Sequence, residues 1–563
     1  SSNVGEEGPY LRLHRNTFVW SGGLLARRGI SFKATPEERK AFSAPFWQGL
    51  DLRGNVYFDR TGNRRVFPSA DIRAEDPPRL TLEEFQAASG QERSSAFRDP
   101  GSLDPMRVCG RTGVRQGARA AAWPMPGSPA PFGLEEQYVL RRANREVEMN
   151  DGIATSLAKL RRGGAFTVAY FGGSITAGTS YRPPFTAWLR AAYPQARVRE
   201  INAGLGGTGS NLGVYRLARD VLRHDPDLVF VEFALNDSDR SSVDPTRIGA
   251  DVESIVRQVW SHDPTTDIVF LYTVSRKLAE TFRRGVQTRE AAIYSTVAER
   301  YRIPTVNFSR RVLELERAGR LVWTLGQAPT AVPKEDPEYE RKVGAEMAAK
   351  GMLVFSGDGV HPRAEGGRLY VDALADFFGR EMPNPYAWNR PNLIAASPFA
   401  PDPCVSPVSL ELSEAWLKGT WRPVAADDGK LGLLLSRTDS MWVTDAPGDS
   451  LSLELDGAEA ALLAAYGPSG GRLDVWVDGR RLPSRDLCDR YCTYWRLMRV
   501  PLFRGARGRH RVEVRVSPDQ PDREPVRAYN ALSDERARQI GLDGCRVAIG
   551  RVLLDGQVSG PLR

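Results

Sequence analysis

Histidine and cysteine are scarce in this sequence, with only five of each among 563 residues. The cysteines stand at positions 109, 404, 488, 492 and 545, and they form no CxxC pair. Cys488 and Cys492 have no second pair of ligands nearby, so the sequence argues against a zinc site and we expect no metal. Three cysteines lie near the carboxyl end, where one disulfide is compatible with an exported protein.

Long hydrophobic runs are also missing. No apolar stretch reaches the length of about 18 residues that a transmembrane helix needs, so we expect no membrane span. Residues 1–10 show neither the basic nor the apolar region of a signal peptide. The location therefore stays open, with a secreted or periplasmic one favoured, and the oligomeric state is not indicated.

Lysine is infrequent, and arginine supplies most of the formal net charge of +8. The arginines are spread along the chain in short pairs such as Arg161-Arg162 and Arg283-Arg284. A nucleic-acid-binding protein would concentrate them in clusters, so we expect no nucleic-acid partner. We interpret the charge as a solvated surface, and an acidic substrate such as a uronic-acid polymer is the alternative.

The middle of the chain alternates between apolar runs and amphipathic helical patterns. Apolar residues recur at helical spacing within residues 185–192, 248–259 and 369–377. Five continuous apolar runs, typical of parallel strands buried on both faces, are predicted as strands at residues 166–171, 198–202, 228–235, 268–274 and 305–308. This alternation predicts a doubly wound α/β domain over residues 150–385.

The flanking parts have a different character. Residues 386–407 are rich in Pro and Asn and are interpreted as a linker. Beyond them, alternating segments such as Leu451-Ser-Leu-Glu-Leu predict an antiparallel β-sandwich over residues 408–563, a fold type that often binds carbohydrate. Residues 1–149 are expected to form an accessory segment that is partly β, with strands within residues 11–20 and 55–58.

Four loops of the central domain carry residues suited to catalysis. Ser174 follows the first strand, a Gly-rich loop at 202–209 follows the second, and Asn236 follows the third. His361 stands three residues after Asp358, before the last helix. Taken singly, these features are also compatible with an N-capping turn, a flexible turn, an Asx turn and half of a metal site. The Gly-rich loop fits neither common nucleotide-binding motif.

The order of these loops resembles that of the SGNH/GDSL hydrolase family. The four blocks of that family are matched by Gly172-Gly-Ser-Ile-Thr176, Asn202-Ala-Gly-Leu-Gly-Gly207, Leu235-Asn-Asp237 and Asp358-Gly-Val-His361. The resemblance implies a flavodoxin-like, five-stranded parallel sheet and a serine esterase that needs no cofactor. It covers the central part of the chain only.

By this resemblance, Ser174 is the nucleophile, His361 the general base and Asp358 the residue that orients the imidazole. The oxyanion hole would consist of the N–H groups of Ser174 and Gly207 and the side chain of Asn236. The sequence departs from the family at Gly173, where many members carry Asp, and at Ala234, where Gly is common. Neither position supplies a triad or oxyanion group.

The expected reaction is hydrolysis of an acyl ester through an acyl-serine intermediate, most simply O-deacetylation of a carbohydrate or polysaccharide. The attached β-sandwich supports this, as do five tryptophans in the flanking domain that could stack on sugars or pack in a core: Trp416, Trp421, Trp442, Trp476 and Trp495. The alternatives are a lipase or acyltransferase with the same triad, and a non-catalytic glycan-binding protein. The long segment Leu321–Phe355 is expected to border the active site.

Overall fold

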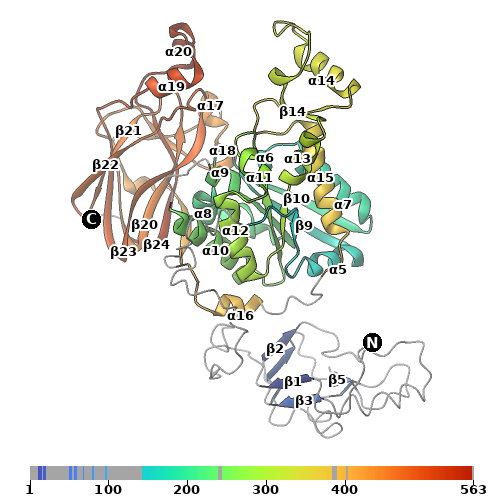
Figure 1. The fold of residues 1–563 in the computed structure, drawn as a ribbon. Coiled ribbons are helices and arrows are strands. Elements are labelled where there is room, and N and C mark those ends of the chain that lie inside the picture. The colour runs from blue at the N-terminus through green and yellow to red at the C-terminus, as the bar shows by residue number, and fades with distance from the viewer. Residues whose placement is uncertain are drawn as a thin grey trace, which may run out of the picture. The chain divides into compact units, whose positions relative to one another are not determined.

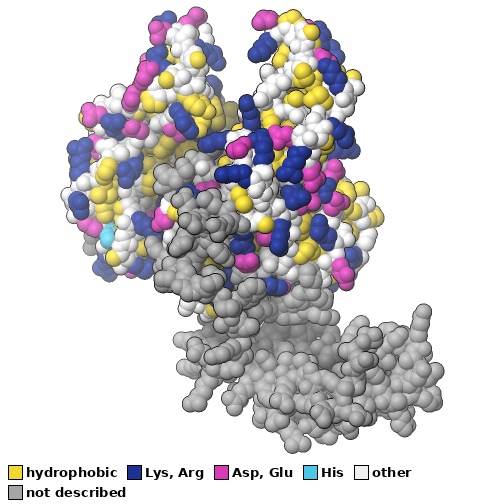
Figure 2. Space-filling model, in the orientation of Figure 1, with side chains coloured by type: hydrophobic (Ala, Val, Ile, Leu, Met, Phe, Trp, Pro, Cys, Tyr) yellow, Lys and Arg dark blue, Asp and Glu magenta, His cyan; other side chains and the backbone are white. Residues whose placement is uncertain are grey.

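The computed structural model describes residues 142–238, 244–382, 390–400 and 403–560, together with seven short strands before residue 98. The chain divides into two compact units, residues 1–122 and 123–563, which we describe separately. Within the described residues, no helix has the length and apolar character that crossing a membrane requires. Figure 2 shows Lys and Arg side chains interspersed with Asp and Glu on the visible face of the described part.

The first unit contains short strands, which agrees with the prediction of a partly β segment. Its strand pairs form one parallel two-stranded sheet, one three-stranded sheet and one antiparallel pair. The strands are β1 (Leu11–His14), β2 (Thr17–Trp20), β3 (Leu50–Arg53), β4 (Val56–Asp59), β5 (Phe67–Pro68), β6 (Arg79–Leu80) and β7 (Ala96–Phe97).

The second unit is built around a six-stranded sheet with the strand order β10-β9-β11-β12-β13-β8 (Figure 1). Five strands are parallel, and the short β8 adds an antiparallel edge that the sequence did not indicate. Their bounds are β8 (Val147–Glu148), β9 (Gly164–Gly172), β10 (Ala196–Gly204), β11 (Leu228–Glu232), β12 (Asp267–Tyr272) and β13 (Thr305–Asn307). The doubly wound parallel sheet is thereby confirmed.

Helices cover both faces of this sheet, which explains why its strands read as unbroken apolar runs. In β9, Val168 and Tyr170 enter one hydrophobic core, and Ala169 and Phe171 enter the other. The first core is closed by α5 (Ala154–Arg162), α7 (Arg182–Ala192), α13 (Ser309–Arg317) and α15 (Ala364–Phe378). The second is closed by α8 (Ser210–Asp220), α10 (Pro245–His262) and α12 (Arg289–Tyr301). The remaining short helices are α6 (Ser174–Ala177), η1 (Leu222–His224), α9 (Ala234–Ser238) and α11 (Ala279–Arg283).

The segment at 321–356 forms a small subdomain with a hydrophobic core of its own. A parallel pair of strands holds it together, and Leu325, Val343, Met347 and Val354 are buried within it. Its elements are β14 (Leu321–Thr324), η2 (Leu325–Gln327), α14 (Tyr339–Ala349) and β15 (Leu353–Ser356).

The carboxyl-terminal part is a nine-stranded sheet whose pairings are all antiparallel, consistent with the expected β-sandwich. Its strands are β16 (Pro407–Glu411), β17 (Leu417–Lys418), β18 (Arg422–Pro423), β19 (Trp442–Thr444), β20 (Ser450–Tyr466), β21 (Arg472–Val477), β22 (Arg480–Asp486), β23 (Arg496–Val516) and β24 (Val547–Gly560). Its helices are η3 (Glu414–Trp416), α17 (Gly429–Gly432), α18 (Leu435–Thr438), α19 (Glu524–Asn530) and α20 (Asp534–Ile540).

One face of this sheet packs against the α/β domain. In β20, Leu462 and Ala464 enter the core of the carboxyl-terminal domain, whereas Ala461 and Leu463 join the core that contains α8 and α10. The alternation follows from the two-residue period of a strand, which allows one strand to serve two cores. The two parts therefore share buried apolar surface.

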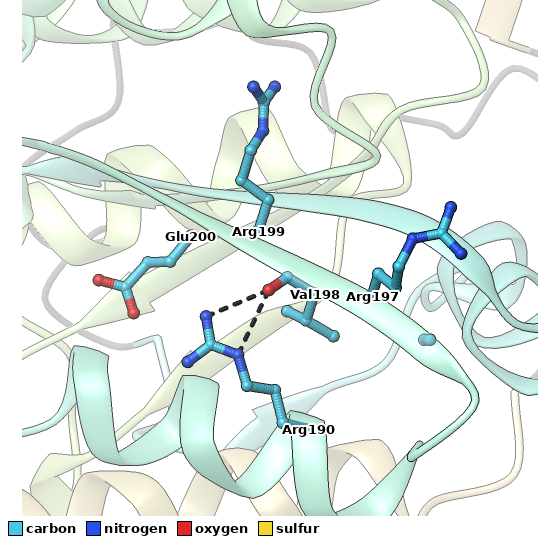
Figure 3. Close-up of a pocket in the computed structure, with 6 residues that line it drawn as sticks. Arg190, Arg197, Val198, Arg199 and Glu200 are labelled. Atoms are coloured by element: carbon cyan, nitrogen blue, oxygen red, sulfur yellow. Dashed lines mark hydrogen bonds between the residues drawn. The ribbon is translucent and has the colours of Figure 1, made fainter.

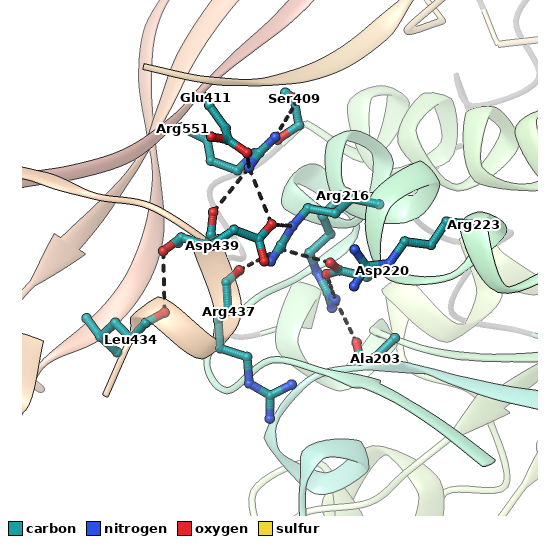
Figure 4. A network of polar contacts seen from close by, with 12 residues as sticks. Ala203, Arg216, Asp220, Arg223, Ser409, Glu411, Leu434, Arg437, Asp439 and Arg551 are labelled. Carbon is teal, nitrogen blue, oxygen red and sulfur yellow. Dashed lines mark hydrogen bonds and ion pairs between the residues drawn. The ribbon is translucent and has the colours of Figure 1, made fainter. Parts of the chain in front are cut away.

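Polar contacts reinforce this junction (Figure 4). Arg219 on α8 donates to Asp439 of the carboxyl-terminal domain at 2.7 Å. Asp220 accepts from Arg216 and from Arg219, each at 3.0 Å. In the segment predicted as a linker, Arg390 begins α16 (Arg390–Ala395) and forms a buried ion pair with the α/β domain. Part of that linker is thus fixed to the α/β domain.

Candidate active site

The structure brings Ser174, His361 and Asp358 into one hydrogen-bonded line. His361 Nε2 lies 2.7 Å from the Ser174 hydroxyl oxygen, and His361 Nδ1 lies 2.6 Å from Asp358 Oδ2. The three residues come from loops at opposite ends of the domain sequence: Ser174 follows β9 of the six-stranded sheet, and the other two follow β15 of the separate β14-β15 pair. This geometry is that of a Ser-His-Asp triad.

Backbone and hydroxyl donors fix the carboxylate of Asp358. The N–H groups of Val360 and His361 each donate to Asp358 Oδ1 at 2.9 Å, and the buried hydroxyl of Ser356 lies 2.9 Å from the same oxygen. Gly359 permits this tight turn because its φ is +86°. Partial burial raises the pKa of Asp358, but the hydrogen bonds from the His361 ring and the backbone outweigh it and hold the pKa well below the usual range. The carboxylate is therefore charged throughout the physiological range.

The nucleophile loop leaves no room for larger residues. A Cβ at Gly172 would lie 2.5 Å from the Thr176 hydroxyl, and a Cβ at Gly173 would lie 2.2 Å from Asn236 Oδ1. Gly173 is the position where many family members carry Asp, and here its missing side chain makes space for Asn236. Helix α6, which begins at Ser174, is a single turn, so its dipole is small.

The other two predicted loops lie beside Ser174. The N–H of Leu205 donates to the carbonyl of Gly172 at 3.0 Å, which ties the Gly-rich loop to the nucleophile loop. A Cβ at Gly206 would lie 3.7 Å from the Cβ of Ser174. Gly207 follows with a φ of +70°, a conformation that favours glycine. The structure thus gathers the predicted oxyanion residues at the same edge as the triad.

Two buried residues beneath the site were not singled out from the sequence. Glu232, the last residue of β11, accepts from the hydroxyls of Thr273 at 2.8 Å and Thr176 at 3.0 Å. Complete burial raises the pKa of Glu232 to about 7, although these hydrogen bonds lower it. The feature of the sequence that could have drawn attention to Glu232 is an acidic residue within an otherwise apolar strand.

The second is Arg216 on α8. Its guanidinium donates to the carbonyl of Gly172, the last residue of β9, at 3.0 Å and to that of Ala203, the next-to-last residue of β10, at 2.6 Å. It also lies over the ring of Phe171, 4.4 Å from the centroid. Arg216 therefore holds together the strand ends from which the nucleophile and Gly-rich loops emerge.

The site is open to solvent. The side chains of His361 and Asp358 are 49% and 53% exposed. Part of the surroundings comes from the 321–356 subdomain, because Thr324 of β14 pairs with Ser356, and its methyl group would lie 3.7 Å from a Cβ at Gly359. Within the described residues, no group of three or more His, Cys, Asp or Glu side chains is arranged to hold a metal ion.

A separate surface recess lies on β10 and α7 (Figure 3). Arg190 and Glu200 are among the residues that line it, and Arg190 donates to the carbonyl of Val198 at 3.1 and 3.3 Å. This recess borders the first half of β10, whereas Ser174 lies beyond the carboxyl end of β9. It is distinct from the triad.

Comparison with known proteins identifies the central domain. Residues 170–369 match the model of the GDSL-like lipase/acylhydrolase family. A two-domain esterase active on acetylated mannans, co-crystallised with mannopentaose, is 18% identical, with 74% of this chain and 100% of that chain covered at a TM-score of 0.50. Another structure of a two-domain esterase active on acetylated mannans gives 19% identity, the same coverage and a TM-score of 0.51. An acetylxylan esterase from Geobacillus stearothermophilus is 18% identical, with 39% and 98% covered at a TM-score of 0.28.

No curated protein matches this chain. At these identities, the two-domain esterases establish a common fold, and the family model covers the part of the chain that holds the four loops. Residues 170–369 of the α/β domain are therefore similar to the GDSL-like lipase/acylhydrolase family.

Proposed function

We propose that this protein is a serine esterase that removes acetyl groups from a carbohydrate through an acyl-serine intermediate. The observation that carries the proposal is the continuous hydrogen-bonded line from Ser174 through His361 to Asp358. Such a line lets the imidazole accept the hydroxyl proton while the carboxylate holds the ring.

In the first step, the Ser174 oxygen attacks the ester carbonyl, and its proton passes to His361 Nε2. The charged Asp358 accepts a hydrogen bond from the N–H at Nδ1, which keeps Nε2 free to act as the base and stabilises the imidazolium that forms. The C–O bond to the alcohol then breaks, and the imidazolium returns the proton to the leaving alkoxide. The alcohol leaves, and the acyl group stays on Ser174.

A water molecule completes the cycle. His361 removes a proton from it, the hydroxide attacks the acyl carbonyl, and the acid is released with the proton returned to Ser174. During both tetrahedral stages the oxyanion would be stabilised by the N–H groups of Ser174 and Gly207 and by the Asn236 amide. The position of Asn236 against Gly173 supports its part in this arrangement.

Two observations support a carbohydrate ester as substrate. The two-domain esterases that share the fold over 74% of this chain act on acetylated mannans. The half-exposed triad also suits a site that acts on a bulky, hydrated polymer.

A lipase or acyltransferase is the second candidate because it would use the same triad. An apolar lid would favour it, but the buried apolar residues of the subdomain at 321–356 pack into its own core or into the core of the α/β domain.

The test is acetate release from acetylated polysaccharides by the wild type and by Ser174→Ala. We expect release by the wild type and a loss of at least about 10³-fold in the variant. Equal rates for the two proteins would contradict the triad assignment. A series of 4-nitrophenyl esters from acetyl to octanoyl then separates the candidates, since an esterase of this kind should prefer acetyl and a lipase the longer chains.

A further inference from the structure

Three exposed tyrosines lie together on the carboxyl-terminal domain. Tyr491, Tyr494 and Tyr529 are 37%, 54% and 57% exposed, and they are three of the five large hydrophobic residues exposed within the described part of the chain. We call these three residues the tyrosine platform. By contrast, the five tryptophans singled out from the sequence are half-buried and not exposed. Three of them pack against the core of this domain, namely Trp416, Trp421 and Trp442.

The platform is held in place by its neighbours. The rings of Tyr491 and Tyr529 meet edge to face with centroids 5.1 Å apart. The Arg490 guanidinium lies 4.8 Å from the first centroid and 5.1 Å from the second. Asn530 of α19 donates to the carbonyl of Arg490 at 2.7 Å, which joins the loop before β23 to α19. Exposed rings that are fixed in this way lose little conformational entropy when a ligand binds.

One arginine connects the platform to the candidate active site. Arg496, at the start of β23, lies 5.7 and 5.9 Å from the ring centroids of Tyr491 and Tyr494. Its Nε would lie 3.8 Å from a Cβ at Gly207, the predicted oxyanion residue. The same Gly-rich loop contacts the nucleophile through Gly206, as described above. A single side chain therefore separates the tyrosines from the loop beside Ser174.

The surroundings leave space for an extended ligand. Figure 2 shows an open notch between the prominence that carries α19 and α20 and the one that carries α14. In the view of Figure 1, α6, which begins with Ser174, lies between and below these prominences. Tyr529 belongs to α19, and Glu340 of α14 pairs with Arg363, two residues after the base His361.

We propose that the tyrosine platform stacks on sugar rings of the substrate, so that the carboxyl-terminal domain supplies part of the substrate-binding site of the esterase. Tyrosine offers a flat apolar face and a hydroxyl, which match the apolar C–H face and the hydroxyls of a pyranose. Arg496 is almost fully buried and already pairs with Asp489 and donates to the Cys492 sulfur. Arg490, the other cation of the platform, donates to the Tyr491 hydroxyl at 2.7 Å. Because both arginines already have partners, the proposed ligand is a neutral glycan in preference to a uronic-acid polymer.

This inference rests on the proposed function, and the experiment separates the two. Tyr494→Ala removes the more exposed of the two rings near Arg496, and Tyr494→Phe retains the stacking face. Leu433→Ala, which alters a residue that is 73% exposed in the same domain, is the matched control. Each variant is assayed on 4-nitrophenyl acetate and on acetylated manno-oligosaccharides and xylo-oligosaccharides.

For Tyr494→Ala we expect the KM on the preferred oligosaccharide to rise about fivefold to tenfold, the loss of one aromatic contact. Activity on 4-nitrophenyl acetate should stay unchanged, and Tyr494→Phe and Leu433→Ala should resemble the wild type on both substrates. An unchanged KM on the oligosaccharide, or an equal loss on both substrates, would overturn the proposal. So would a wild type that cleaves the small ester but none of the oligosaccharides, and that result would leave the esterase assignment intact.

A binding measurement covers the case in which no ester is cleaved. Calorimetric titration of Ser174→Ala with mannopentaose and xylopentaose, with and without Tyr494→Ala, tests the platform without any turnover. We expect the second substitution to weaken binding about fivefold to tenfold. Equal affinities, or no binding of either oligosaccharide, would overturn the platform even if the triad is active.

Discussion

Replacing the buried Glu232 with Gln should remove the part of the pH dependence of folding stability that this carboxyl group contributes. The carboxyl group of Glu232 is fully buried, and its pKa is raised from 4.5 to about 7. Gln has the same shape, carries no charge and can exchange hydrogen bonds with the two threonine hydroxyls that now donate to the carboxylate. The substitution therefore isolates the cost of ionising this position.

The sign follows from the two pKa values. Below pH 4.5 the carboxyl group is neutral in both states and costs no stability. Between 4.5 and 7 the unfolded chain ionises first, so the folded state loses about 1.4 kcal/mol per pH unit. Above 7 both states are ionised and the loss levels off at about 3 kcal/mol. Between about pH 5 and about pH 8, Glu232 should thus cost the wild type about 2.5 kcal/mol that the variant does not lose.

Urea unfolding followed by tryptophan fluorescence, at about pH 5 and about pH 8, measures this difference. The quantity to compare is the free energy of unfolding of Glu232→Gln minus that of the wild type, which should grow by about 2.5 kcal/mol at the higher pH. Glu335→Gln, at an exposed position of the 321–356 subdomain, is the control for loss of one charge. A difference that stays the same at both pH values would refute the reasoning.

Three further predictions concern the site and its support. Asp358→Asn should lower kcat on 4-nitrophenyl acetate about 10³-fold to 10⁴-fold, because the variant no longer holds His361 in the required tautomer. Circular dichroism should show an unchanged fold, and a loss of kcat below about tenfold would contradict the prediction. Gly173→Ala should lower kcat about 10²-fold, since the added methyl group would displace Asn236. In the double variant, Asn236→Ala should lower kcat little further; if the losses of kcat from the two substitutions were fully additive, the contact between these positions would be contradicted. Arg219→Ala removes one of the ion pairs between the two domains and should lower the unfolding free energy in urea by about 1 kcal/mol, because Asp439 is half exposed. No change would mean that this ion pair does not stabilise the junction, which Arg247 and Glu459 also bridge.

The predicted strands and loops followed from local patterns. Continuous apolar runs gave the five parallel strands, because a strand covered on both faces must be apolar on both. The short β8 was missed, since a strand of two residues carries too little pattern to be recognised. The segment read as a linker contains α16, whose fixation depends on the ion pair between Arg390 and the distant Asp267.

The residues that support the site were less accessible from the sequence. The candidate triad stood out because its residue types form a rare combination and its loops come in a recognisable order; its members are Ser174, Asp358 and His361. Glu232 and Arg216 belong to no motif of this kind, since their role depends on which carbonyls and hydroxyls surround them once they are buried. Their contribution comes from long-range contacts that residue spacing does not encode.

The sequence by itself determined the class of fold and the residues proposed for the chemistry, because both depend on periodicity and on residue type at strand ends. Only the tertiary structure decided how these residues meet, that Gly173 makes room for Asn236, and that Arg496, which lies near two rings of the tyrosine platform, reaches the Gly-rich loop at Gly207. Such contacts join positions far apart in the sequence, and the geometry of those between domains is set by the packing of the two domains over a shared core.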